Sequence, residues 1–432
     1  MFVSRANKQT RSLHAAAGWD DLRAHNSGVV LRAAWRAERT SRADLARETG
    51  LSRATVSDIV SGFVDAGLLE DTEDAAPRSS SGGRPPTVLR FVDDGRHILG
   101  IELGASHLVV VRTDLRGRVL QRVTRELDVA GEPEGTLRAM TELALACLPS
   151  ESTVIGVGLA LPTPLRQGEG ARLSPRLFPR WEGIDVAVVL QAALGIRVQA
   201  DNDANLGALA EHWWGAGRGV GDLAYIKVAT GVGAGILIGG EIHRGAGGIA
   251  GEIGHTSIDP SGARCRCGLT GCLEAMVGTS YLLARAEASL VGASERPAWA
   301  TPHPTSERLI RAAKAGDAVA TALVRDAGRQ LGVAVANLLN LVNPARVILG
   351  GRLTDAGEPL VTALEGSVRE RALWSSVDGY DVRIGALGDD AVALGAATLL
   401  LREALLDPAA HLGAPVSAFS RRGDPAAPPP PA

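Results

Sequence analysis

The sequence predicts an α/β protein that carries a small helical domain in front of it. Apolar residues recur at helical spacing between residues 20 and 67. From residue 98 onward, short apolar runs that end in glycine turns alternate with longer helical stretches, which is the pattern of an α/β sheet protein. The chain has 432 residues, 45% of them hydrophobic, and is long enough for two or three domains.

The charge is unevenly distributed along the chain. The net charge is -3, but residues 1–57 contain ten Lys and Arg against five Asp and Glu. A basic segment in a nearly neutral chain indicates a local anionic partner. The sequence shows no apolar run of about 18 residues and no secretory signal pattern, so we expect a cytoplasmic protein without a membrane span.

The helices of the N-terminal part have clear end signals. Ser41 is followed three residues later by Asp44, which resembles a capping box, and Gly50 ends that helix. Ser52 then caps the next helix. Two short helices joined around a glycine predict a helix-turn-helix.

Small hydroxyl side chains and one Arg occupy the start of the second of these two helices. They are Ser52, Arg53, Thr55 and Ser57. Such side chains suit base edges and phosphates, and the helix dipole adds attraction for phosphate. We expect these residues to contact double-stranded operator DNA; the alternative is a three-helix bundle that binds another protein.

An extended hairpin is expected after the helices. Leu68 to Glu70 begins one strand, Thr87 to Val92 forms the other, and the turn contains Gly82 to Pro86. Arg84 lies in this narrow turn, a shape that suits insertion into an A·T-rich minor groove. The hairpin completes a winged helix-turn-helix; the alternative is a domain linker with an incidental Arg.

The α/β part opens with a strand, a glycine turn and a second strand. Ile98 to Gly104 enters the turn, and Leu108 to Thr113 leaves it. A second glycine-rich turn, Ala229 to Gly235, follows a later strand. The two turns together resemble the phosphate hairpins of the actin-like ATPase fold.

Polar residues follow the strand that ends at Ala200. Asn202 and Asp203 stand between this strand and a helix, where ligands bind in α/β sheets. We expect both side chains to reach a ligand and Asn205 to be structural. The alternative is that Asn202 and Asp203 only cap the helix.

Three of the four cysteines lie close together after a histidine. His255, Cys265, Cys267 and Cys272 form a complete ligand set for a tetrahedral structural zinc ion. Clustered thiols in a chain with one further cysteine fit a reducing compartment and metal binding. The alternatives are reduced thiols beside a hydrogen-bonded histidine, or a redox sensor.

The same stretch resembles the signature of the ROK family (repressors, open reading frames and sugar kinases). Gly251 to His255 reads Gly-Glu-Ile-Gly-His, and Cys265 to Glu274 reads Cys-x-Cys-Gly-x-x-Gly-Cys-x-Glu. The resemblance covers roughly residues 96–405 and implies a two-lobed actin-like domain with a sugar between its lobes. The residues that it implies to contact a hexose or sugar derivative are Asn202, Asp203, Glu252, His255 and Glu274.

The resemblance and the patterns together predict the division of the chain. We expect a flexible arm at 1–19, a winged helix-turn-helix domain at 20–95, the two-lobed domain at 96–406 and a disordered tail at 407–432. The lobes are expected at about 96–200 with 391–406, and at 201–390.

The first glycine turn departs from the kinases of the family. Asp203 matches their general base, but Glu102, Ala105 and His107 replace the Asp, the second Gly and the Lys of Asp-x-Gly-Gly-Thr-Lys. A longer acid, an added Cβ and a lost fixed charge predict poor phosphoryl transfer. We therefore expect a protein that is not an enzyme, with Asp203 as a vestigial base.

The resemblance thus implies a sugar-responsive transcriptional regulator, expected to repress carbohydrate genes. We expect a homodimer or a dimer of dimers on an inverted repeat with A·T-rich flanks. Sugar-induced release from DNA and sugar-enhanced binding are both compatible with the sequence. The alternative is a sugar kinase with an appended DNA-binding domain.

Arg176 is either a contact for an anionic sugar or a solvated surface residue.

Overall fold

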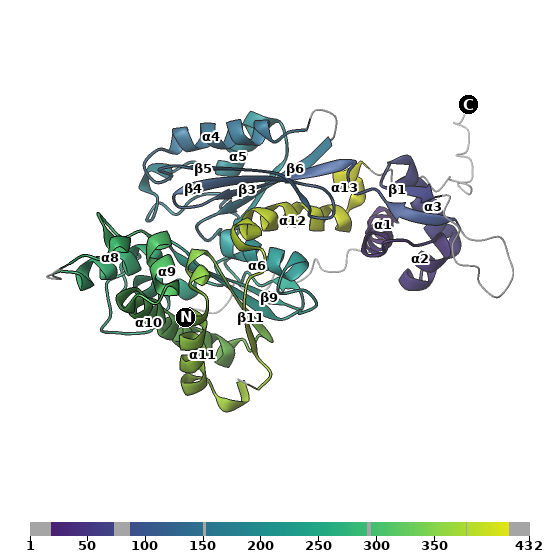
Figure 1. Cartoon of the computed structure of the whole chain (residues 1–432). Helices are drawn as coiled ribbons and strands as arrows, with labels where there is room; N and C mark the ends of the chain where they lie inside the picture. Colours follow the sequence, from purple (N-terminus) through teal and green to yellow (C-terminus); the bar gives the residue numbers. More distant parts are fainter. Residues whose placement is uncertain (1–18, 73–86, 150–152, 292–294, 377, 414–432) are drawn as a thin grey trace, which may run out of the picture. The chain divides into compact units, whose positions relative to one another are not determined.

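The computed structural model describes residues 19–72, 87–149, 153–291, 295–376 and 378–413 (Figure 1). It divides into two compact units, Met1–Gly95 with Leu401–Ala432, and Arg96–Leu400. Within the described ranges, no helix combines the length and the apolar character that crossing a membrane requires.

The described N-terminal part of the first unit contains three helices and a pair of antiparallel strands. They are α1 (Trp19–Arg36), α2 (Arg42–Thr49), α3 (Arg53–Asp65), β1 (Leu69–Thr72) and β2 (Val88–Phe91). The predicted helix ends are confirmed: Ser41 and Ser52 cap α2 and α3, and Gly50 ends α2 with a φ of 72°. The turn that contains Arg84 lies outside the described residues.

The C-terminal part of the first unit corrects one prediction. A disordered tail was expected from residue 407, but Pro408–Leu412 forms a short helix, α13. The Asp407 side chain caps it by accepting from the backbone N–H of Ala410 at 3.1 Å. Leu412 is buried. The proline-rich composition of the tail as a whole concealed this local capping signal.

The first sheet of the second unit has five strands. In spatial order they are β5 (Val119–Glu126), β4 (His107–Thr113), β3 (Arg96–Leu103), β6 (Thr153–Leu161) and β7 (Val198–Asn202). The strands β3, β4 and β5 form an antiparallel meander, and β6 and β7 run parallel to β3. Leu99, Ile101 and Leu103 of β3 share a buried core with helices α4 (Pro133–Ala146) and α5 (Val186–Leu194).

The opposite face of β3 receives α12 (Ala391–Leu406). A Cβ on Gly100 would lie 2.0 Å from the carbonyl oxygen of Ala393, and one on Gly158 would lie 1.8 Å from that of Ala396. Only glycine permits this close approach of a helix to a sheet. A helix near the end of the chain therefore packs on the sheet that begins the unit (Figure 1).

The second sheet has the order β10 (Glu241–Ile242), β9 (Val232–Ile238), β8 (Leu223–Val228), β11 (Arg346–Gly350) and β12 (Asp381–Ile384). One face packs on α8 (Thr279–Ser289), α9 (Ser306–Lys314), α10 (Ala318–Leu341) and α11 (Glu358–Arg371). The other face contacts α6 (Asp203–Trp214). The longest of these helices, α10, is capped by Asp317, whose side chain accepts from the backbone N–H of Ala320.

Candidate functional site

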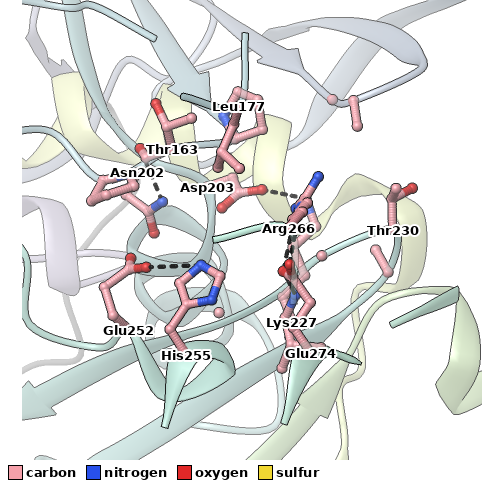
Figure 2. A pocket seen from close by; sticks show the side chains of 18 of the residues that line it. Thr163, Leu177, Asn202, Asp203, Lys227, Thr230, Glu252, His255, Arg266 and Glu274 are labelled. Carbon is pink, nitrogen blue, oxygen red and sulfur yellow. Dashed lines mark hydrogen bonds and ion pairs between the residues drawn. The ribbon is translucent and has the colours of Figure 1, made fainter. Parts of the chain in front are cut away.

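A pocket opens between the first and the second sheet of the second unit, which are called its first and second lobe below, near the carboxyl ends of β7 and β8 (Figure 2). Its first-lobe wall includes Thr163 and Leu177. The structure brings together all five residues that the resemblance implied for sugar binding: Asn202, Asp203, Glu252, His255 and Glu274. They come from three separate segments, so the tertiary fold assembles the pocket.

Asn202 both caps α6 and lines the pocket. Its Oδ1 atom accepts from the backbone N–H of Ala204 at 3.0 Å, and its Nδ2 atom donates to the carbonyl of Thr163 at 3.2 Å. The cap therefore holds Asn202 in place and does not compete with its position at the pocket. Asn205 is buried and donates to Asp201 at 3.0 Å, as expected for a structural residue.

Two of the pocket residues, Lys227 and Arg266, were not anticipated from the sequence. The Nζ atom of Lys227 lies 2.8 Å from Oε1 of Glu102 and 2.9 Å from Oδ2 of Asp203. Burial lowers the pKa of Lys227, but the charges of Asp203 and Glu102 raise it more, so its pKa lies above the usual value. The available signal was a lone basic residue in the apolar strand Leu-Ala-Tyr-Ile-Lys-Val.

Glu102 is almost fully buried below this lysine. Burial raises the pKa of its carboxyl group. The charge of Lys227 and the hydrogen bond from His107 lower this pKa by more than burial raises it, to about 2. Glu102 is therefore ionised at neutral pH and balances the buried ammonium group.

Arg266 forms a two-pronged ion pair with Glu274. Its Nε atom lies 2.8 Å from Oε1 and its Nη2 atom 3.2 Å from Oε2 of Glu274. The same Oε2 atom accepts from the backbone N–H of Val232 at 3.0 Å. Both oxygens of Glu274, which the resemblance implies as a sugar contact, therefore already have partners within the protein. Arg266 could have been noticed from its place between Cys265 and Cys267.

Glu252 lies beside His255 on the opposite wall, with 3.9 Å between Oε2 and Nε2 (Figure 2). Burial and the nearby charges of Asp203 and Glu274 raise the pKa of Glu252 to about 7. A carboxyl group with this pKa can donate or accept a hydrogen bond near neutral pH. It thus differs chemically from the permanently ionised Glu102.

The four expected zinc ligands converge on one point. One donor atom from each of His255, Cys265, Cys267 and Cys272 lies within 4.8 Å of the others. The Sγ atoms of Cys267 and Cys272 are 3.6 Å apart, and Nδ1 of His255 is 3.8 Å from Sγ of Cys265. Burial and the neighbouring thiols raise the pKa of Cys272 to about 12. One nitrogen and three sulfurs at this spacing fit zinc, which would hold the thiols as thiolates.

The first glycine turn lies at the pocket, whereas Arg176 lies outside it. Ala105 and His107 line the pocket. Arg176 is exposed and is not part of the pocket lining; its guanidinium group lies against Gly268 in the cysteine loop. The structure therefore favours the surface interpretation of Arg176 over a direct contact with an anionic sugar.

Four of the five candidate DNA-contacting residues lie together at the start of α3. Ser52, Arg53 and Ser57 are exposed, and Thr55 is half-buried. The Ser52 side chain accepts from the backbone N–H of Thr55 at 3.1 Å, and the two hydroxyl groups are 2.9 Å apart. Capping therefore engages part of the hydroxyl set and leaves the Arg53 side chain exposed beside it.

Comparison with known proteins gives a consistent set of relatives. A sequence model described as the ROK family matches residues 98–403. A xylose repressor of Caldicellulosiruptor bescii is 29% identical over 395 residues, which cover 90% of this chain and 98% of that protein. A glucokinase of Thermotoga maritima is 32% identical over 311 residues, which cover 70% of this chain and 96% of that protein.

Two solved structures also include one regulator and one kinase of this family. A ROK family transcriptional regulator, a homologue of the E. coli MLC protein, has a TM-score of 0.74 and 28% identity, covering 90% of this chain and 98% of its own. A ROK family glucokinase from Streptomyces griseus, in complex with glucose and AMPPNP, has a TM-score of 0.64 and 27% identity. It covers 70% of this chain and 98% of its own.

Proposed function

Because the chain belongs to the ROK family, we propose that it is a sugar-responsive transcriptional repressor of carbohydrate genes. The observation that carries the proposal is how much of this chain its repressor relative covers. The xylose repressor aligns with 90% of the chain, and the tenth that it leaves uncovered is shorter than the segment 19–95. The repressor alignment therefore includes part of the N-terminal helical unit, whereas the family model begins at residue 98.

The proposed DNA-binding element is the pair α2 and α3, joined around Gly50. Ser52, Arg53, Thr55 and Ser57 would enter the major groove, because they lie at the N-terminal end of α3, where the helix dipole is positive. Arg84 would contact the A·T-rich minor groove, and Arg84→Ala should weaken A·T-rich operators most. We propose a homodimer or a dimer of dimers on an inverted repeat.

The proposed effector is a hexose or a sugar derivative in the pocket between the lobes. Asn202, Asp203, Glu252, His255 and Glu274 would pair with its hydroxyl groups. Zinc, held by His255 and the three cysteines, would supply a rigid scaffold for this wall and no reaction chemistry. Metal ligation through one ring nitrogen fixes the histidine tautomer and leaves the other nitrogen for a hydroxyl group.

Sugar binding can change DNA affinity only if the sugar prefers one conformation of the protein. Closure of the two lobes around the pocket is the proposed difference.

The second candidate function is a sugar kinase with an appended DNA-binding domain. The presence of Asp203 and the 32% identity to a glucokinase favour it. Sugar-dependent ADP release that disappears in Asp203→Asn would support this alternative.

The deciding experiment is a selection of genomic DNA fragments by purified, zinc-loaded protein, repeated with a panel of sugars. We expect enrichment of an inverted repeat with A·T-rich flanks and a changed yield with one sugar. If no fragment is enriched under any condition, the proposal of a DNA-binding repressor is wrong.

A further inference from the structure

The cleft between the lobes contains a cation that belongs to the protein itself. Lys227 of β8 reaches Glu102 of β3 and Asp203 at the start of α6, at 2.8 and 2.9 Å. Because β3 and β8 belong to different sheets, one ammonium group joins the two lobes. The Lys227 side chain is 12% exposed and that of Glu102 is 4% exposed, so solvent screens this interaction only weakly.

The choice of lysine at this position has a physical reason. The chain has only three lysines among its 45 Lys and Arg residues. An ammonium group is a compact point charge with three donors, whereas a guanidinium group is a wide planar fork. A point charge between two carboxylates resembles a bound metal ion more closely than an arginine could.

The kinase relatives lead to a different expectation for this cleft. The Streptomyces griseus glucokinase was solved with glucose and AMPPNP. Magnesium in phosphoryl-transfer sites is held by one or two carboxylates together with the phosphates. Here the acids at the first glycine turn and at the proposed sugar site are Glu102 and Asp203, and the Nζ atom of Lys227 stands between them. A divalent cation would have to displace this ammonium group.

The glycine turn next to Glu102 is also unsuited to a phosphate. A Cβ built on Gly104 would lie 2.3 Å from Cε1 of His107, so the imidazole ring covers this side of the turn. The Nε2 atom of His107 is 3.5 Å from Oε1 of Glu102. The open backbone that a phosphate oxygen would approach is thus occupied by a side chain of the protein. The residues do not fit a magnesium nucleotide.

We propose that the ammonium group of Lys227 replaces the divalent cation of the kinases and joins Glu102 to Asp203 without metal or nucleotide. The pocket then binds its ligand independently of magnesium and of nucleotide. Asp203 stays paired with a fixed positive charge, so it orients a ligand and does not serve as a base. This inference concerns the cleft alone and does not depend on DNA binding.

The test measures binding of Mn²⁺ to the full-length, zinc-loaded protein by electron paramagnetic resonance. Wild-type protein is expected to show no Mn²⁺ site in this cleft. Lys227→Met frees two adjacent carboxylates. This variant should bind one Mn²⁺ at least about tenfold more tightly than the control variant Lys314→Met does. The gain should disappear in the double variant Lys227→Met/Asp203→Asn. The matched control is Lys314→Met, since Lys314 is exposed at the end of α9 and should behave as wild type.

Two results would overturn the proposal. One is Lys227→Met that binds Mn²⁺ no more tightly than Lys314→Met. The other comes from wild-type protein, so it remains decisive if Lys227→Met does not fold. Titration of wild type with Mn²⁺ and AMPPNP together should give no protein-bound Mn²⁺. A wild-type Mn²⁺·AMPPNP complex that is lost in Asp203→Asn would show that the cleft accepts a metal nucleotide despite Lys227.

Discussion

The guanidinium group of Arg266 holds both carboxylate oxygens of Glu274, at 2.8 Å from Oε1 and 3.2 Å from Oε2. Arg266 lies between two of the proposed zinc ligands, Cys265 and Cys267. Glu274 is buried and lines the pocket. The cysteine loop and the pocket wall are therefore joined by one ion pair, and a change in the loop reaches the ligand site directly.

Arg266→Met should destabilise the protein, because it leaves the Glu274 carboxylate buried without its ion pair, with the Val232 N–H at 3.0 Å and the Cys265 thiol at 3.9 Å as its partners. Arg266 is partly exposed, so we expect a cost of about 1–3 kcal/mol rather than the full penalty of a buried charge. Thermal unfolding of the zinc-loaded protein measures it as a fall in Tm. Arg369→Met is the control, because Arg369 pairs with Glu365 at 3.6 Å on the surface. A Tm for Arg266→Met equal to that of the control would show that this ion pair contributes nothing.

Cys267→Ser should abolish zinc binding, because serine is a poor ligand for zinc and the site needs all four donors. Metal analysis of the purified protein should fall from about one zinc per chain to nearly none. Cys147→Ala is the control: Cys147 is buried in the core of the first lobe, away from the cluster, and its loss should leave zinc content unchanged. Equal zinc in Cys267→Ser and wild type would remove this cysteine from the ligand set.

Glu102 should stabilise the folded protein in a pH-dependent way. Its pKa of about 2 in the fold lies below the ordinary value of 4.5. The stabilisation is therefore complete above pH 4.5 and is lost as the pH falls from 4.5 towards 2, up to about 3 kcal/mol in total. The free energy of unfolding of wild type minus that of Glu102→Gln should shrink over this range.

Wild type and Glu102→Gln have the same zinc ligands. The difference between their free energies of unfolding therefore cancels the effect of acid on the metal site. Glu365→Gln, which changes a carboxylate near the surface, should give a curve parallel to wild type. A parallel curve for Glu102→Gln as well would mean that Glu102 has an ordinary pKa in the folded protein.

Arg53→Ala should weaken binding to the selected operator by about 1–3 kcal/mol if Arg53 reads a base. If it contacts a phosphate, all DNA sequences should be weakened alike and the salt dependence should decrease by about one counterion. Fluorescence anisotropy at several salt concentrations separates these cases. Arg369→Ala, in the other unit, should leave DNA affinity unchanged. Full affinity and an unchanged salt dependence in Arg53→Ala would exclude Arg53 from the DNA interface.

Much of the secondary structure could be predicted because its signals are local. The capping side chains Ser41, Ser52 and Asp317 bond to backbone N–H groups three residues away in the sequence. The same principle explains why α13 was missed: its cap Asp407 was present, but the composition of the tail outweighed it. Helix ends are determined within one turn of chain, so sequence suffices for them.

By itself, the sequence determined the proposed zinc ligands, the five residues that meet in the pocket and the family to which the chain belongs. Only the tertiary structure placed Lys227 on Glu102, because these residues are 125 positions apart and belong to different sheets. A motif records residues that are close along the chain. An ion pair between lobes depends on how two sheets pack, and no spacing in the sequence encodes that distance.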